Sequence, residues 1–334
     1  MTGSHNMQSV VTKALIYDLK KIVPSGVFVN LSLAKISRWN IGGLADVIVR
    51  PQSPEQIRKL REYFYKNNIA HVVIGMTSNL LFSDKGLLVP CIQLGYEMNK
   101  INIDSNIVTA QAGAWVPKLA REVQKAKLVG AEHICGVPGT LGGLVYMNGG
   151  SQRKGIGSSV SKVVSIDSKG GYVTRNRVDC LFAYRSSIYQ CRDEIISEVV
   201  LNFEDADSSS LVRKEMLSIL SSRKKKFPRK IPNCGSVFKS DPSAYSLYGP
   251  PGKIIEDLGL KGYARGGAKI SEEHANFITN IEGATSSDVI FLIELIKERA
   301  FSELGCQLNA EVKYVDEHGC ICAADQIDKN KAKF

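Results

Sequence analysis

The sequence predicts an α+β protein built from two or three compact units. The chain has 334 residues, and a domain usually contains roughly 100–200 residues. Segments with helical spacing of apolar residues are interspersed with short apolar or alternating segments typical of strands. Hydrophobic residues make up 44% and charged residues 23% of the chain, which is typical of a globular protein with a large core.

A strand–helix–strand unit is predicted near the N-terminus. Residues 45–50 (ADVIVR) and 71–75 (HVVIG) are the strands, the second of them buried. Between them, Ser53 is an N-cap and Pro54 occupies the first helical position. The apolar residues that follow at helical spacing are Ile57, Leu60 and Phe64.

Further elements are predicted from local signals. Residues 163–175 (VVSIDSKGGYVTR) indicate a hairpin with SKGG as its turn. Thr285 and Asp288 fit a capping box, and Gly305 is a helix stop. Helices are expected over residues 116–127, 211–226 and about 286–304.

Membrane insertion and export are not indicated. The apolar run at 289–296 (VIFLIELI) is far shorter than the roughly 20 residues of a membrane span. The opening residues 1–7 include a run typical of vector-derived sequence and are set aside. We therefore expect no membrane partner.

The cysteines indicate a reducing compartment. The chain has eight of them, without the spacing of a disulfide framework, so reduced thiols in a cytoplasm are expected. Cys320 and Cys322 follow His318 in HGCIC, but a fourth ligand is missing nearby. We expect an exposed tail there and no metal.

The net charge of +10 favours an anionic partner, either a nucleic acid or a small molecule. The densest basic run is 223–230 (RKKKFPRK), which is short for a nucleic-acid patch. A solvated helix end leading into a linker explains most of this run, and one or two of its residues are candidates for binding phosphate. We expect no nucleic-acid partner.

Two glycine-rich loops are candidate phosphate sites. The first glycine loop covers residues 75–86 (GMTSNLLFSDKG) and the second glycine loop covers 135–150 (CGVPGTLGGLVYMNGG). Small residues allow backbone N–H groups to approach an anion closely. Neither loop is a Walker A or G-x-G-x-x-G motif. Together, and with Asn79 and Asn148, they predict a bound dinucleotide of undetermined identity.

These loops belong to a series of eight motifs that extends over about residues 35–315. The motifs are NIGGLADVIVRP (40–51), IGMTSNLLFSDKG (74–86), GVPGTLGGLVYMNGG (136–150), FAYRSSIY (182–189), PNCGSVFK (232–239), PGKIIEDLGLKGYARGGAKIS (251–271), HANFITN (274–280) and LNAEV (308–312). Eight motifs in one order are far more specific than any one alone, and this series resembles the UDP-N-acetylenolpyruvoylglucosamine reductase (MurB) family in its shorter form.

The resemblance implies a domain organisation. An FAD-binding region of the vanillyl-alcohol-oxidase (PCMH) type is expected over 8–210, in two subdomains of about 8–85 and 86–210. A smaller α/β substrate-binding domain is expected over 211–316, followed by a tail over 317–334.

The resemblance also implies a reaction. The family uses NADPH and FAD to reduce the enolpyruvyl ether of a UDP-sugar, UDP-N-acetylglucosamine enolpyruvate, to the lactyl ether UDP-N-acetylmuramate. This reaction belongs to peptidoglycan precursor synthesis, and hence to cell-wall biogenesis, cell shape and cell division. A bacterial cytoplasmic location is implied, and we expect a monomer.

The resemblance also implies which residues of this chain are catalytic and which bind the substrate. By resemblance, Ser236 is the proton donor, Arg185 grips the substrate carboxylate and a protonated Glu311 hydrogen-bonds the enolate. The implied substrate-binding residues are Tyr184, Arg223, Asn233 and Lys253, of which Arg223 and Lys253 would face the UDP diphosphate. His274 and Asn276 are assigned no chemical role.

The implied FAD-binding residues lie in the two glycine loops. They are Gly75, Thr77, Ser78, Asn79, Leu80, Gly136, Pro138, Gly139, Thr140, Gly142, Gly143 and Asn148.

Two departures from the family pattern fall in these loops. Thr77 stands where glycine is usual, and residues 148–155 read NGGSQRKG instead of N-A-G followed by an aromatic and an acidic residue. Because of these departures, two alternatives to the family's reaction stay open: a diverged paralogue that acts on another nucleotide sugar, or an FAD oxidase. A non-catalytic flavin-binding protein is disfavoured because the Arg, Ser and Glu set is complete, and a nucleic-acid binder is less favoured still.

Overall fold

The computed structural model describes residues 9–228, 230–240 and 247–327. Arg229 of the basic run and the excluded residues 1–7 lie outside the described residues. The helices are α1 (Lys13–Ile22), α2 (Leu33–Ile36), α3 (Pro54–Lys66), α4 (Val116–Lys125), α5 (Leu141–Tyr146), α6 (Ser209–Lys226), α7 (Pro251–Asp257) and α8 (Ser286–Leu304).

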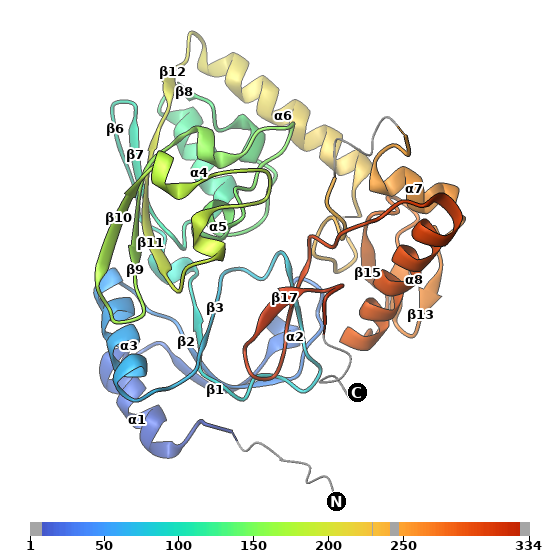
Figure 1. Cartoon of the computed structure of the whole chain (residues 1–334). Helices are drawn as coiled ribbons and strands as arrows, with labels where there is room; N and C mark the ends of the chain where they lie inside the picture. Colours follow the sequence, from blue (N-terminus) through green and yellow to red (C-terminus); the bar gives the residue numbers. More distant parts are fainter. Residues whose placement is uncertain (1–8, 229, 241–246, 328–334) are drawn as a thin grey trace, which may run out of the picture.

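The strands belong to separate small sheets (Figure 1). They are β1 (Val27–Ser32), β2 (Leu44–Val49), β3 (Val72–Ile74), β4 (Leu80–Phe82), β5 (Cys91–Gln93), β6 (Ile101–Asp104), β7 (Ile107–Gln111), β8 (Leu128–Val129), β9 (Val160–Ile166), β10 (Tyr172–Asn176), β11 (Ile195–Asn202), β12 (Glu204–Asp205), β13 (Ala264–Arg265), β14 (Ala268–Ile270), β15 (Ile278–Asn280), β16 (Lys313–Val315) and β17 (Ile321–Ala323).

The predicted strand–helix–strand unit is confirmed as β2, α3 and β3. The sheet order is β1-β2-β5-β3, so β5 lies between the two predicted strands and pairs in parallel with both. The Ser53 side chain accepts a hydrogen bond from Gln56 N, and Pro54 begins α3. The helix buries the predicted face of Ile57, Leu60 and Phe64.

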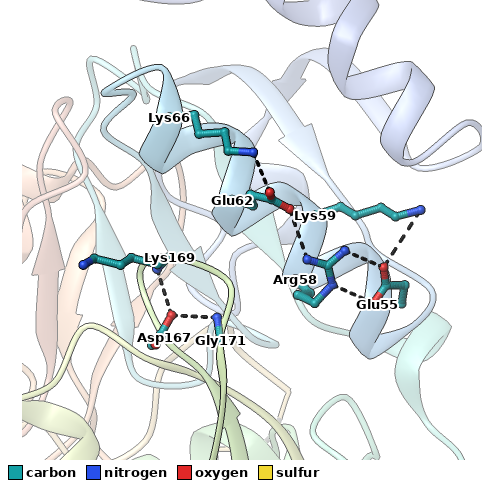
Figure 2. Close-up of polar contacts among 8 residues, drawn as sticks. All are labelled: Glu55, Arg58, Lys59, Glu62, Lys66, Asp167, Lys169 and Gly171. Carbon is teal, nitrogen blue, oxygen red and sulfur yellow. Dashed lines mark hydrogen bonds and ion pairs between the residues drawn. The ribbon is translucent and has the colours of Figure 1, made fainter.

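The predicted hairpin is also confirmed. Strands β9 and β10 pair antiparallel at the edge of a sheet in the order β10-β9-β11-β7-β6. In the turn, Asp167 Oδ1 accepts hydrogen bonds from the backbone N–H groups of Lys169 and Gly171, each at 2.8 Å (Figure 2). A short acceptor side chain that bonds its own backbone a few residues on is a typical turn device.

The hairpin turn packs against α3. A Cβ added at Gly170 would lie 2.9 Å from Arg58 O, so the contact requires glycine. The outer face of α3 carries ion pairs of Arg58 with Glu55 and Glu62, and of Glu62 with Lys66 (Figure 2). Because these pairs are exposed, they contribute little to stability, and the apolar face holds the helix in place.

Helix α6 connects the two halves of the molecule, and in Figure 1 it runs from the β8–β12 side toward α7. Its buried residues Val212, Met216 and Ile219 pack in the same hydrophobic core as α3 and α4. The basic run begins in its last turn. The division into domains at residue 210 stays a prediction.

A second core forms around α7 and α8. The capping box of Thr285 and Asp288 is confirmed, and Gly305 ends α8 with a left-handed φ of 65°. Asp84, from the first glycine loop, accepts hydrogen bonds from Ser286 N at 2.9 Å and Ser286 Oγ at 2.7 Å. The first glycine loop therefore caps a helix of the C-terminal half.

The chain returns to its N-terminal half at β16, which pairs in parallel with β4. The expected exposed tail around Cys320 and Cys322 is wrong in part: Cys320 is exposed, but β17 pairs antiparallel with β16 and Ala324 is 1% exposed. The physical reason is that β16 offers an open edge to the strand that follows it. Across the described residues, no helix is long and apolar enough to cross a membrane.

Candidate active site

A cavity of about 1850 Å³ lies where the two glycine loops meet the C-terminal half. This volume exceeds the roughly 300–1,000 Å³ of a typical small-molecule site. The cavity is lined by the predicted cofactor-binding residues Gly75, Thr77, Ser78, Asn79, Leu80, Gly136, Pro138, Gly139, Thr140, Gly142 and Gly143. It is also lined by all three predicted catalytic residues, Arg185, Ser236 and Glu311.

The two glycine loops touch each other along one wall of the cavity. A Cβ at Gly75 would lie 2.6 Å from Thr140 Oγ1, and a Cβ at Gly139 would lie 3.0 Å from Ser78 Oγ. Gly139 also has a φ of 141°, which favours glycine. The glycines are therefore required for the approach of one loop to the other.

Thr77, which stands where the family usually has glycine, is buried in the first glycine loop. Its φ of 55° lies in the left-handed region, which is costly for a β-branched residue. Its hydroxyl donates to Ile36 O at 3.0 Å and accepts from Arg38 N at 3.2 Å. The side chain that replaces glycine thus offsets its backbone strain by holding the loop to residues 36–38.

Arg185 and Glu311 form an ion pair inside the cavity. Arg185 Nε donates to Glu311 Oε1 at 2.7 Å, and the two side chains are 22% and 16% exposed. Burial raises the pKa of the Glu311 carboxyl above its ordinary range, although Arg185 and Lys239 oppose the shift. A buried carboxyl with a raised pKa beside an arginine can exchange a proton or a hydrogen bond with a bound anion.

Arg185 is held in a strained conformation, with a φ of 53°. Its carbonyl accepts a hydrogen bond from Gln190 Nε2 at 3.0 Å. Asn148 Nδ2 donates to Ala183 O at 2.9 Å, and Asn148 Oδ1 accepts from Gly157 N at 2.9 Å. The amide of Asn148, which we expected to bind the cofactor, is thus engaged in holding the loop that carries Arg185.

Ser236 lies in the serine loop, residues 232–239. Asn233 Oδ1 accepts from Gly235 N at 3.0 Å, and Gly235 has a φ of 83°, so the chain turns sharply before the serine. On the other side, Val237 O accepts from Glu311 N at 2.7 Å. These bonds bring the serine loop beside the segment that carries Glu311.

The family-motif residues without an assigned role support this loop. Asn276 is 3% exposed, and its amide bonds both Phe238 N and Phe238 O. Its own carbonyl accepts from Val237 N at 2.9 Å, and its N–H donates to His274 Nδ1 at 3.2 Å. Cys234 is buried, which raises its pKa to about 12, and its thiol donates to Thr77 O. We assign these residues a structural role.

Two lysines near Glu311 were missed by the sequence analysis. Lys239 acts electrostatically on both Glu311 and Lys313, and burial lowers the pKa of Lys313, which lines the cavity. Lys313 begins β16, but Glu311 lies before that strand, so strand alternation gave no signal that the two side chains share a face.

The predicted substrate-binding residues are only partly brought together. Arg223 and Asn233 line the cavity, and a Cβ at Gly136 would lie 2.6 Å from Arg223 Cδ. Within the described part of the chain, Tyr184 and Lys253 do not line the cavity, and neither does the predicted cofactor-binding residue Asn148. The Tyr184 hydroxyl accepts from Ser240 N at 3.2 Å, and Lys253 pairs with Asp257 at 2.7 Å.

The cavity fits a flavin dinucleotide. Its volume and its lining by both glycine loops suit a long ligand with a diphosphate. There is also open space beside Gly143, where an added Cβ would meet only Thr140 Oγ1 at 3.5 Å. The described residues contain no group of three or more His, Cys, Asp or Glu side chains that could hold a metal.

Comparisons with known proteins agree with this assignment. Residues 45–174 match the family model of an FAD binding domain, and residues 227–315 match that of the UDP-N-acetylenolpyruvoylglucosamine reductase C-terminal domain. The chain is 42% identical over 298 residues to UDP-N-acetylenolpyruvoylglucosamine reductase 1 of Corynebacterium glutamicum, covering 89% of each protein. It is 34% identical over 308 residues to the reductase of Caldanaerobacter subterraneus subsp. tengcongensis, covering 92% of this chain and 100% of that protein.

A solved structure gives the same result. The crystal structure of UDP-N-acetylenolpyruvylglucosamine reductase from Thermus caldophilus superimposes with a TM-score of 0.72 at 26% identity, over 86% of this chain and 97% of that one. The fold and the cavity define an FAD-dependent oxidoreductase, and the predicted fold class and FAD cofactor are confirmed. The chain belongs to the UDP-N-acetylenolpyruvoylglucosamine reductase family.

Proposed function

We propose that the chain uses NADPH to reduce UDP-N-acetylglucosamine enolpyruvate to UDP-N-acetylmuramate in peptidoglycan precursor synthesis. The observation that carries this proposal is the Arg185–Glu311 pair at 2.7 Å, in the same cavity as Ser236 and both glycine loops. The names of the similar proteins support the choice of substrate.

The residues of the two glycine loops that line the cavity would hold FAD. Backbone N–H groups of the small residues can approach its diphosphate, with Ser78 and Thr140 as hydroxyl partners. Bound FAD would supply the chemistry of hydride transfer, from NADPH to the terminal carbon of the enolpyruvyl group.

Arg185 and Glu311 stabilise the charge that this reduction creates. Hydride addition breaks the C=C π bond and leaves an electron pair shared between the neighbouring carbon and the carboxylate. Because Glu311 occupies Nε of Arg185, the two terminal nitrogens of the guanidinium remain to bind that carboxylate. The raised pKa of Glu311 allows a protonated carboxyl that donates a hydrogen bond to the enolate.

Ser236 completes the reaction as the proton donor. Its hydroxyl proton forms the C–H bond at the neighbouring carbon, and the electron pair of the O–H bond stays on the serine oxygen, which then regains a proton from solvent. A serine is a weak acid, so the negative oxygen needs nearby cations. Arg185 and Lys313 line the same cavity and are the candidates for this role.

The UDP part of the substrate is assigned to the other predicted residues. Arg223, which lies against Gly136, binds the diphosphate, and Asn233 shapes the serine loop. Lys253 and Tyr184 join them when the substrate is bound. The chain acts as a cytoplasmic monomer, with the FAD-binding region over 8–210 and the substrate domain over 211–316.

Anaerobic stopped-flow at the flavin absorbance tests the proposal. The wild type should consume NADPH in the presence of UDP-N-acetylglucosamine enolpyruvate. In Ser236→Ala, flavin reduction by NADPH should be nearly unchanged, because the enolpyruvyl group is not yet involved. Flavin reoxidation by the substrate should slow by about 10²–10⁴-fold, and Ser236→Cys should retain more because a thiol can donate a proton.

Two results would contradict this assignment. Normal reoxidation in Ser236→Ala would remove the serine from the mechanism. Reoxidation of the wild-type flavin by oxygen alone, with no response to the enolpyruvyl substrate, would indicate an oxidase instead.

A further inference from the structure

The segment that carries Glu311 is held from several directions. We call residues 310–312 the carboxyl segment. Glu311 N donates to Val237 O of the serine loop at 2.7 Å, and Glu311 O accepts from Asn79 Nδ2 of the first glycine loop at 3.0 Å. The backbone of Glu311 is therefore tied to the loops on which Ser236 and the cofactor-lining residues lie.

Val237 O also accepts from Val312 N at 3.4 Å, and Phe238 forms an isolated β-bridge with Ala310. Further contacts come from the C-terminal tail, beyond residue 315, where the match to the family's C-terminal domain ends. The Asp325 side chain is 3% exposed, and its Oδ2 accepts a hydrogen bond from Ala310 N at 3.2 Å. The same oxygen pairs with Lys297 Nζ of α8 at 2.5 Å. Ala324 N donates to Val312 O at 2.9 Å. The tail thus bonds the residues immediately before and after Glu311.

A buried carboxylate is costly to desolvate unless it is paired and hydrogen-bonded. Lys297 and Ala310 N therefore hold the Asp325 carboxylate in place, and that carboxylate in turn holds the Ala310 N–H, in addition to the β-bridge of Ala310 with Phe238. Because Ala310 adjoins Glu311, a shift of the carboxyl segment moves the Glu311 carboxylate relative to the Arg185 guanidinium, which lies 2.7 Å away. A misplacement of about 1 Å in an active site can reduce a rate about 10²-fold.

We propose that Asp325 is a positioning residue: anchored by Lys297, it holds the carboxyl segment so that Glu311 meets Arg185. This inference rests on the proposed catalytic role of Glu311. It assigns to the C-terminal tail a function in the second half-reaction, in which the enolpyruvyl group is reduced and protonated.

The alternative is that Asp325 only stabilises the contact between the tail and α8. In that case its loss should lower the melting temperature and slow both half-reactions together. Positioning predicts a selective effect. In Asp325→Ala, flavin reduction by NADPH stays near the wild-type rate, and flavin reoxidation by the enolpyruvyl substrate slows by about 10- to 100-fold.

Two variants make the comparison sharper. Asp325→Asn keeps an oxygen acceptor for Ala310 N but loses the charge opposite Lys297, so it should retain most of the reoxidation rate. Glu317→Gln removes the ion pair with Lys85, at 3.3 Å in the same tail, without touching the carboxyl segment. It should leave both half-reactions unchanged.

A titration without substrate separates this inference from the proposed function. The Glu311 carboxyl is followed by carbon-13 NMR in the FAD-loaded protein, with Glu311→Gln to assign the signal. Arg185 and Lys239 act on this carboxyl, and Asp325 acts on Lys313 and Cys322. Loss of the Asp325 charge alone should leave the pKa of Glu311 near its wild-type value, because burial, Arg185 and Lys239 shift that pKa. Loss of the Arg185 contact raises it in Asp325→Ala alone.

A Glu311 pKa that rises in Asp325→Ala but not in Asp325→Asn supports positioning, even if the wild type fails to reduce the enolpyruvyl substrate. A Glu311 pKa that changes equally in the two variants, or in neither, overturns it. Equal slowing of both half-reactions in Asp325→Ala, or an unchanged reoxidation rate in that variant, overturns it as well.

Discussion

The two walls of the cavity are built in different ways. The glycine-loop wall consists of small residues, hydroxyls and backbone, and its loops meet at contacts such as Gly75–Thr140 where a Cβ would not fit. The catalytic wall consists of charged side chains from distant segments, and Arg185 and Glu311 are 126 residues apart. The first wall depends on where side chains are absent, and the second depends on how the folded chain brings side chains together.

The difference has a consequence for mutation. A change in the glycine-loop wall acts on the backbone and so on cofactor retention and stability. A change in the catalytic wall acts on charge and so on one half-reaction. The contacts of Asn79 with Glu311 and of Cys234 with Thr77 join the two walls, so each supports the other.

The largest expected effect is at Glu311. In Glu311→Gln, flavin reoxidation should slow by about 10²–10⁴-fold, because an amide cannot act as the carboxylic acid.

Stability at neutral pH should not fall in this variant. The folded state raises the pKa of this carboxyl above its unfolded value of 4.5, so its stabilising contribution, present below pH 4.5, is lost as pH rises through the folded pKa.

Thermal unfolding of wild type and Glu311→Gln at acidic and at alkaline pH checks this sign. The variant should gain stability relative to wild type as the pH rises. A relative loss at alkaline pH would mean that the ion pair with Arg185 outweighs burial.

A smaller effect is expected at Arg223, which lies against Gly136 of the glycine-loop wall. Arg223→Ala should weaken binding of the UDP substrate by about 1.5–3 kcal/mol through loss of a charge-assisted contact. Lys253→Ala should weaken it less, because Lys253 must leave Asp257 to reach the diphosphate. Isothermal titration with UDP-N-acetylmuramate measures both.

The exposed neighbours Lys224 and Lys225 serve as matched controls, and their alanine variants should bind normally. Equal losses at all four positions would indicate a diffuse field of positive charge instead of a defined diphosphate contact.

Thr77 tests the glycine-loop wall. Thr77→Val keeps the strained β-branched residue but loses the bonds to Ile36 O and Arg38 N, so it should cost about 1–3 kcal/mol of stability. Thr77→Gly also loses the bonds but relieves the strain, so it should be the milder variant. Urea unfolding and FAD affinity are the measurements, and a milder Thr77→Val would show that the hydroxyl does not offset the strain.

The smallest effect is expected on acidification. His71 is partly buried beside Arg61, whose Nη1 lies 2.6 Å from His71 Nε2, so the ring nitrogen accepts and the neutral form is required. Burial lowers the pKa of His71 below 6.5, as it does for His133 and His274. The unfolded chain therefore binds more protons below pH 6.5, and the free energy of unfolding falls there.

Urea unfolding between about pH 7 and pH 5 measures this slope. His71→Gln should flatten the slope in part, because the other two histidines still contribute. An unchanged slope would exclude His71 as a source of acid sensitivity.

The sequence by itself determined the elements with local signals. The N-cap of Ser53, the capping box of Thr285 and Asp288, and the turn at 167–171 each depend on residues within a few positions of one another. The two glycine loops indicated a dinucleotide, and the order of eight motifs indicated the family. These features needed no knowledge of which distant segments meet.

Only the tertiary structure decided the rest. In the folded chain, β5 lies between β2 and β3, the amide of Asn148 bonds Ala183, and the tail residue Asp325 bonds Ala310. The reason is that these contacts join segments far apart in the chain, and no local pattern specifies such a partner. Asp325 in particular resembles any surface aspartate in the sequence, and it becomes a buried acceptor only because β17 pairs with β16 and carries the following residues into the second core.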